Sequence, residues 1–489
     1  MTLSTALRTA TSSLAASAKQ VSVLSRNIAG VADADYVRRN STVSTDLYGT
    51  VSVKTQRYVN RTIYDATILA NANTTSANIV AAGFNNMIAL NGTEEFSHSP
   101  AALLGKLQQA TEFAAASPAE SASLSSMIES ARTAANSLNQ ISKSLLSMKA
   151  TADKEIGASI SKMNDLLDKL HSVNDEIVSR SRIGLEVHDG MDKRDAILSS
   201  LSEEIGIKVT SRENNDIVVV TNNGLMLFEK VPRSVSFQPT PVFGPNTAGN
   251  IITIDGVAVG VSNSAFPLSS GRLAGNIKLR DEILPQSLTQ LDEIARGLIE
   301  QFSEKDQSSG GGKPAIAGLL TWSGGPSIPL SAALEQGIAL TIKVNPLVDP
   351  QSGGNMNLIR DGGINGDADY ITNSSGAAGF SDRLFELSSS FDVTINFDVQ
   401  GGLPTDRSLL EYANSALDWL NSNRQSALSS ESYHADLAAQ YKEIFQNETG
   451  PNLDFEMSKL LEIERTYQAS AKLMATIDDL FSVLLNSVR

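Results

Sequence analysis

The sequence predicts a mainly α-helical protein with β elements. In this fold the N- and C-terminal regions form a long antiparallel helical rod or coiled coil, and a mainly β outer domain is inserted. Three observations carry the prediction. Both ends of the chain repeat apolar residues every 3.5 positions, residues 119–183 hold a helical pattern without a proline, and residues 307–400 contain the alternation typical of half-buried strands.

The C-terminal region, residues 450–489, carries the clearest pattern. Alternating steps of three and four residues trace a mostly apolar seam, which is typical of a helix that winds around another helix. The seam consists of Leu460, Ile463, Tyr467, Ser470, Met474, Ile477, Phe481, Leu484 and Val488.

The N-terminal region, residues 1–35, carries a matching seam made of Leu3, Leu7, Ala10, Leu14, Ser17, Val21, Leu24 and Ile28. Residues 1–32 hold three cations and no acid, whereas residues from 450 onward hold six acids and four cations. A basic helix beside an acidic one favours pairing of the two ends over pairing of like helices. Two alternatives stay open. Each end packs separately on a globular body, or the acid-free, serine-rich N-terminus is an organellar transit peptide.

Several stretches between the ends predict strands. Residues 41–64 are rich in Thr, Val and Tyr, which suit extended chain. Residues 217–228 read as a hairpin around an Asn-Gly turn, and residues 251–261 read as another. Apolar residues alternate over 338–344 and 393–399, and this alternation predicts a strand in each stretch.

The remaining periodic stretches predict helices. Helical periodicity covers residues 68–90, and residues 119–183 form one rod-like helix or a helix broken once near Thr151. Because a rod of this length needs partners along its side, the helical runs 279–302 and 409–445 are expected to pack on it.

These elements predict three parts. Residues 1–35 and 450–489 form a terminal coiled-coil domain, residues 36–306 and 401–449 form a helical rod with β elements, and residues 307–400 form the inserted β domain. A linker rich in Gly, Ser and Pro opens the insert.

Composition excludes several classes of protein. The net charge of −15 argues against a nucleic-acid surface, and the absence of cysteine excludes disulfides and thiolate metal sites. No stretch is long and apolar enough for membrane insertion, and the start lacks the apolar run of a cleavable signal. A cytosolic protein fits these facts, and so does one exported by a route that removes no leader.

No stretch predicts a catalytic, cofactor or metal site. The four histidines lack paired metal spacing, and Pro314 follows Gly310-Gly311-Gly312-Lys313 where a phosphate loop needs Ser or Thr. The acidic loop 361–369 resembles a calcium loop but lacks two of its ligands, so a turn is expected there. Asp192, Arg194 and Asp195 are expected to form an ion-pair network on a solvated face that holds a helix to a strand.

The two ends resemble the axial proteins of the bacterial flagellum. Asn27-Ile28-Ala29 with Tyr36 and Arg38 is similar to their N-terminal motif, and residues 452–472 look like their C-terminal motif. Asp35 stands where the family usually has Gly, Gly30 and Ala32 replace its usual Asn residues, and Glu464 stands where Gln is common. Asp tolerates the left-handed conformation, so the turn at Asp35 is expected to survive.

The interior narrows this resemblance. Gly190-Met191-Asp192-Lys193-Arg194-Asp195 with the following Ile205-Gly206-Ile207, then residues 269–291, and then residues 358–364 resemble the FlgK family of hook-associated proteins. The resemblance is patchy, covers most of the chain and keeps its order.

The resemblance implies a non-enzymatic structural subunit at the hook–filament junction. It would be exported unfolded from the cytoplasm by the flagellar type III route, and it would assemble through the terminal seams. Implied partners are copies of itself, the hook protein, the second hook–filament junction protein and an export chaperone at the C-terminal helix. The alternatives are a hook or rod subunit of the same axial family, or an extracellular calcium-dependent binding module or hydrolase.

Overall fold

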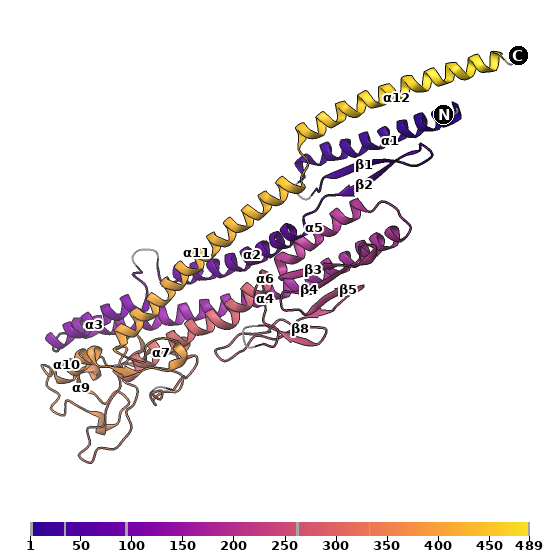
Figure 1. Ribbon diagram of the computed structural model, residues 1–489. Helices are drawn as coiled ribbons and strands as arrows, with labels where there is room; N and C mark the ends of the chain where they lie inside the picture. The colour runs from indigo at the N-terminus through magenta and orange to yellow at the C-terminus, as the bar shows by residue number, and fades with distance from the viewer. Residues whose placement is uncertain (1–2, 34–35, 93–95, 261–263, 332, 488–489) are drawn as a thin grey trace. The chain divides into compact units, whose positions relative to one another are not determined.

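The computed structural model describes residues 3–33, 36–92, 96–260, 264–331 and 333–487 (Figure 1). Asp35 and Val488 of the predicted motifs lie outside these residues. The helices are α1 Leu3–Ala29, α2 Arg61–Ala89, α3 Pro100–Ala116, α4 Ser121–Arg182, α5 His188–Glu204, α6 Gly271–Lys278, α7 Leu284–Gln301, α8 Ile338–Thr341, α9 Leu358–Asp361, α10 Asp382–Ser389, α11 Leu409–Thr449 and α12 Leu453–Ser487.

Small antiparallel sheets accompany the helices. Strands β1 Arg39–Thr45 and β2 Val51–Arg57 form a hairpin, and β3 Ile207–Ser211, β4 Ile217–Thr221, β5 Met226–Glu229 and β6 Val231–Pro232 form a four-stranded meander. The other sheets join β7 Val235–Ser236, β8 Ile252–Ile254 and β9 Val257–Val259, then β10 Leu320–Thr321 with β11 Lys343–Val344, and β12 Ile395–Asn396 with β13 Asp406–Arg407. The predicted class, mainly α with β, is confirmed.

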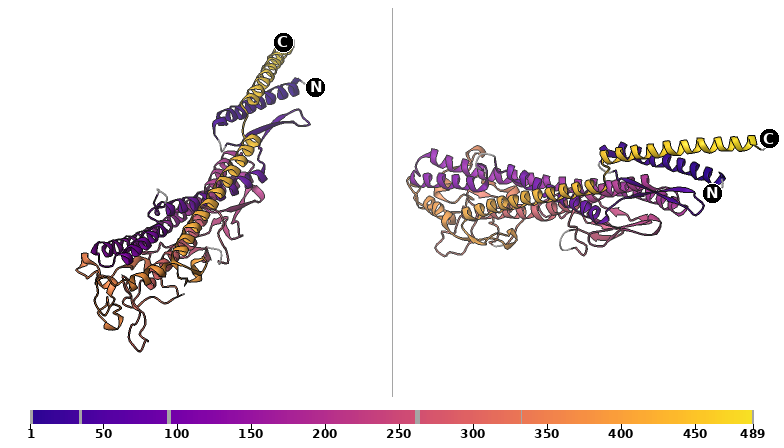
Figure 2. Two further views of the ribbon diagram at one scale, coloured as in Figure 1. Left: turned by 90° about the vertical axis from the view of Figure 1, so that its left-hand side faces the viewer. Right: turned by 45° about the horizontal axis from the view of Figure 1, so that its top comes forward.

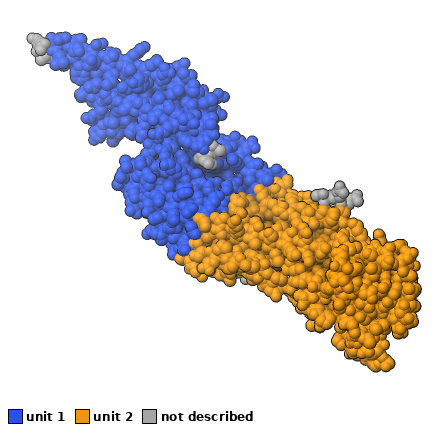
Figure 3. All heavy atoms as spheres, turned by 180° about the vertical axis from the view of Figure 1, so that it is seen from behind, with its two compact units in different colours: residues 1–74, 162–234, 433–489 blue, residues 75–161, 235–432 orange. Residues whose placement is uncertain are grey.

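The chain divides into two compact units (Figure 3). Unit 1 comprises residues 1–74, 162–234 and 433–489, and unit 2 comprises residues 75–161 and 235–432. The three-part division expected from the sequence stays a prediction.

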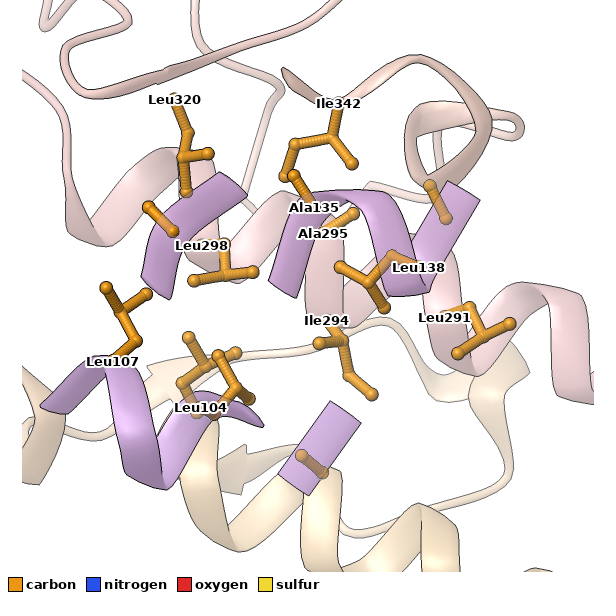
Figure 4. Close-up of a cluster of buried hydrophobic side chains, with 14 of the residues drawn as sticks. Leu104, Leu107, Ala135, Leu138, Leu291, Ile294, Ala295, Leu298, Leu320 and Ile342 are labelled. Atoms are coloured by element: carbon orange, nitrogen blue, oxygen red, sulfur yellow. The ribbon is translucent and has the colours of Figure 1, made fainter. Parts of the chain in front are cut away.

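The predicted rod helix is one unbroken helix, α4, which passes through Thr151 without interruption. In unit 2 its apolar seam, which includes Leu124, Ile128 and Leu138, is buried in the core. Figure 4 shows Leu138 of α4 beside Ile294 of α7 in this core. Both helices therefore meet through leucine and isoleucine side chains that would otherwise expose apolar surface to water.

The inserted segment differs from its prediction. Its strands β10 to β12 have two residues each, and residues 338–341, expected as a strand, form the short helix α8. Ile338 and Ile342 are both buried, a spacing of four that fits one face of a helix as well as one face of a strand. Val393 and Val399, expected on a half-buried strand, are exposed, so the prediction of a mainly β segment is wrong.

Candidate assembly site: the paired terminal helices and their polar joint

The two terminal helices lie side by side and antiparallel in unit 1 (Figures 1 and 2). The Oγ atoms of Ser13 and Ser470 are 3.2 Å apart, and Asn27 Nδ2 donates to Glu456 Oε2 at 3.0 Å. A step of 14 residues forward along α1 thus corresponds to 14 residues backward along α12. The ends pair with each other, as the seams predict.

A narrow stripe of α12 is buried in this pair. Glu456, Ile463, Ser470 and Ile477 are buried and recur every seven residues. Leu460, Met474 and Phe481 are half-buried, whereas Tyr467 and Leu484 are exposed. Seven-residue spacing keeps one side of a helix toward a partner helix, so the stripe has coiled-coil geometry.

The seam residues of α1 also differ in how deeply they are buried. Leu24 is buried, and Leu3, Leu7, Leu14, Val21 and Ile28 are half-buried. Whether the thirteen seam residues join copies of the chain stays a prediction. Those residues are Leu3, Leu7, Leu14, Val21, Leu24, Ile28, Leu460, Ile463, Tyr467, Met474, Ile477, Phe481 and Leu484.

The β1–β2 hairpin lies along another side of α1. Val51 N donates to Ser12 Oγ at 3.0 Å, and Lys19 Nζ donates to Val53 O at 3.4 Å. The hairpin therefore covers a different side of α1 from the side that α12 covers.

A polar joint sits where α1, α12 and the base of the hairpin meet. We define it as Asn27, Arg38, Arg39, Arg57 and Glu456, with the carboxylates of α5. Asn27, which is fully buried, donates to Arg39 O at 2.8 Å and accepts from Arg39 N at 3.0 Å. Its remaining donor binds the buried carboxylate of Glu456, which also accepts from Arg38 Nε at 2.6 Å. Because unpaired buried polar groups are costly, this network fixes how the helices meet.

The joint continues from the hairpin to α5. Arg39 binds Asp189 at 2.5 Å and Asp192 at 2.8 Å, and Arg57 binds Asp192 at 2.9 Å and Asp195 at 2.8 Å. Burial raises the pKa of Asp192, although Arg57 and Arg39 oppose that effect. The two arginines therefore offset only part of the desolvation cost of this carboxylate.

These contacts refine the ion-pair network expected around Asp192. Asp192 and Asp195 do hold a helix to strands, but the arginine side chains they meet are under 10% exposed, so the face is not solvated. Arg194 instead donates to Asn215 O at 2.6 Å and Asn174 Oδ1 at 3.2 Å. Sequence reasoning missed Arg39, Arg57 and Glu456 as site residues. Glu456 gave one signal, since it stands seven residues before Ile463 and so falls on the buried stripe.

The carboxylates of the acidic loop, residues 361–369, pair with cations that lie outside the loop. Lys313 Nζ lies 2.8 Å from Asp367 and 2.6 Å from Asp369, and Asp361 binds Arg360 at 2.8 Å. The hydrogen bond from Lys313 lowers the pKa of Asp367. Among the described residues, no group of three His, Asp or Glu side chains is placed to hold a metal ion, and no helix is long and apolar enough to cross a membrane.

Two family models and several known proteins are similar to parts of this chain. Residues 93–311 match the family model described as flagellar hook-associated protein FlgK helical domain, and residues 451–487 match flagellar basal body rod FlgEFG protein C-terminal. The chain is 22% identical over 377 residues to flagellar hook-associated protein 1 of Bacillus subtilis (strain 168). This alignment covers 72% of this chain and 69% of that protein. Identity to flagellar hook-associated protein 1 of Escherichia coli (strain K12) is 24% over 156 residues, or 31% of this chain and 28% of that protein. The solved flagellar hook junction protein FlgK from Burkholderia pseudomallei aligns with a TM-score of 0.43 and 17% identity over 53% of this chain and 47% of that one.

Proposed function

This chain belongs to the FlgK family of flagellar hook-associated proteins, structural components of the hook–filament junction, and we propose that α1 and α12 build it into that junction. The observation that carries the proposal is the incomplete cover of α12. This helix buries four of its 35 residues, while Leu461, Leu473, Leu480 and Leu485 are each at least half exposed. Apolar surface of this extent on one helix marks a place where further chains bind.

The physical mechanism is burial on assembly. Terminal helices with little local core gain most of their order when neighbouring subunits cover them. A head-to-tail contact repeated by a rotation closes a ring, and one repeated by a screw builds a tube. The proposed neighbours are copies of the chain, the hook protein and the second hook–filament junction protein.

Export precedes this assembly in the proposal. The chain leaves the cytoplasm unfolded through the flagellar type III route, and a chaperone covers α12 until then. In the assembled protein, residues 1–35 and 450–489 form the inner layer, residues 36–306 and 401–449 form the rod, and residues 307–400 form the outer segment. This division is proposed from the chain order of the elements.

The test is secretion and motility of the full chain and two truncations. We expect the full chain in culture supernatant only when the flagellar export gate is intact. Removal of residues 1–32 or 452–489 is expected to leave unit 2 folded and to abolish swimming. Normal swimming by either truncation would contradict the proposal, and microscopy that places the chain along the whole hook would favour a hook subunit.

A further inference from the structure

We propose that the tip of the β1–β2 hairpin of one copy docks on the exposed face of α12 in the neighbouring copy. The hairpin tip is defined as Leu47 and Tyr48, and the α12 face as Leu473, Leu480 and Leu484. This inference rests on the proposed function and names the two surfaces that join adjacent copies.

The hairpin tip presents apolar side chains in a fixed turn. Leu47 is fully exposed, and Tyr48 is 74% exposed. Asp46 Oδ1 accepts from Tyr48 N at 2.9 Å and from Thr50 N at 2.7 Å, so the turn is held from inside. A rigid aromatic and a leucine at the end of an ordered hairpin lose little conformational freedom on binding. Tyrosine is one of the residue types enriched among the hot spots of protein interfaces.

The α12 face is apolar and uncovered. Leu473, Leu480 and Leu484 follow spacings of seven and four, so they share one side of the helix, and each is at least half exposed. Leu473 and Leu480 flank the buried stripe, and Leu484 continues its line seven residues after Ile477. A neighbour that binds there therefore extends the apolar contact between α12 and α1.

The hairpin tip and the α12 face lie at the same level along the axis of the helix pair. Gly49, next to the tip, packs against Thr9 of α1, because an ideal Cβ atom at Gly49 would lie 2.7 Å from Thr9 Oγ1. The register set by Ser13 and Ser470 places Thr9 opposite α12 near Met474, between the levels of Leu473 and Leu480. When two copies lie side by side at the same level, the hairpin tip of one copy therefore faces α12 of the other. Figure 1 shows the hairpin and α12 on different sides of α1.

Unpaired charges favour this arrangement. Arg8, Lys19 and Arg26 of α1 and Lys54 of the hairpin are exposed, and within the described part of the chain none of them pairs with a carboxylate of α12. Glu464, Asp478 and Asp479 of α12 are also exposed. A contact between unlike surfaces brings these opposite charges together, whereas α12 against α12 brings carboxylates together.

Cysteine crosslinking tests the inference without background, because the chain has no cysteine of its own. The double variant Tyr48→Cys with Leu480→Cys is expected to give a ladder of linked copies on flagella isolated from swimming cells. Either single variant alone should give no dimer, and cells that make both single variants should give dimers only. Leu47→Cys with Leu484→Cys supplies a second pair if the first fails to assemble.

Ser13→Cys with Ser470→Cys is the matched control, because those side chains touch within one copy and should link without a ladder. Dimers from Tyr48→Cys alone, or no ladder from either pair in flagella that contain the chain, would overturn the inference and leave the proposed function intact. Absence of the wild-type chain from isolated flagella would overturn both.

Discussion

Removal of the Glu456 carboxylate tests whether the polar joint holds α12 to α1. Glu456 is fully buried and accepts from Arg38 Nε at 2.6 Å and from Asn27 Nδ2 at 3.0 Å. Glu456→Ala deletes both acceptors and leaves the buried amide of Asn27 with an unpaired donor. Alanine is at least as good a helix former as glutamate, so the substitution does not weaken the helix itself.

The expected cost follows from the environment of the two donors. Breaking a buried charge pair by removing one partner costs about 3–5 kcal/mol. The Arg38 side chain is 30% exposed, so water compensates part of its loss, and we expect about 3 kcal/mol at the low end of that range. Glu462→Ala is the matched control on the same helix, because Glu462 forms an exposed pair with Lys459 worth less than about 1 kcal/mol.

Hydrogen exchange of the full chain, followed by mass spectrometry, measures the loss of stability separately for each helix. A loss of about 3 kcal/mol lowers protection of α1 and α12 by about 100-fold, or to the rate of an unpaired helix, whichever is reached first. Helix α7 and residues 121–161 of α4, which belong to unit 2, should exchange as in the wild type. If Glu456→Ala and Glu462→Ala change the exchange of α12 equally, the joint does not hold the helix pair.

Three further predictions concern other parts of the chain. Ile477→Asp puts a carboxylate at a position that is 4% exposed, and it should make α12 more sensitive to limited proteolysis. Leu473→Asp should leave the pairing of α12 with α1 intact. If proteases cut α12 equally fast in both variants, the assigned register is wrong. Burial raises the pKa of Asp292 to about 6, so its contribution to stability is full below pH 4 and is lost as the pH rises through 6. The stability difference between wild type and Asp292→Asn, measured by denaturant unfolding, should therefore fall by up to about 3 kcal/mol between pH 4 and 7, and a rise would refute the assignment. Calcium titration by calorimetry should show no micromolar binding because Lys313 already neutralises Asp367, and a measurable heat would contradict that pairing.

The sequence predicted what depends on periodicity. The stripe through Ile463 and Ile477 and the helical state of α4 follow from spacings that a helix imposes. Periodicity left open a break in α4 near Thr151, and the structure shows one unbroken helix there. The polar joint could not be predicted, because Arg39 and Arg57 meet Asp192 across more than 130 positions of the sequence, and only the tertiary fold brings them together. The helix α8 was missed for another reason. Its four residues are too few to separate a helical spacing from a strand alternation, and the carboxylate of Asp292, which accepts from Ala339 N at 2.8 Å, lies 47 positions away.

The position of the joint explains how a weakly covered helix pair selects one register. The buried stripe of α12 repeats every seven residues, so a slip of one heptad would again place isoleucine or serine toward α1. Such a slip would move Glu456 away from Asn27 and Arg38 and leave a buried carboxylate without a partner, at a cost larger than the apolar contact of one turn provides. A single buried polar contact thus specifies register, as a polar residue does in the seam of other coiled coils. The seam itself then needs little stability of its own, which agrees with the proposal that neighbouring copies cover the terminal helices.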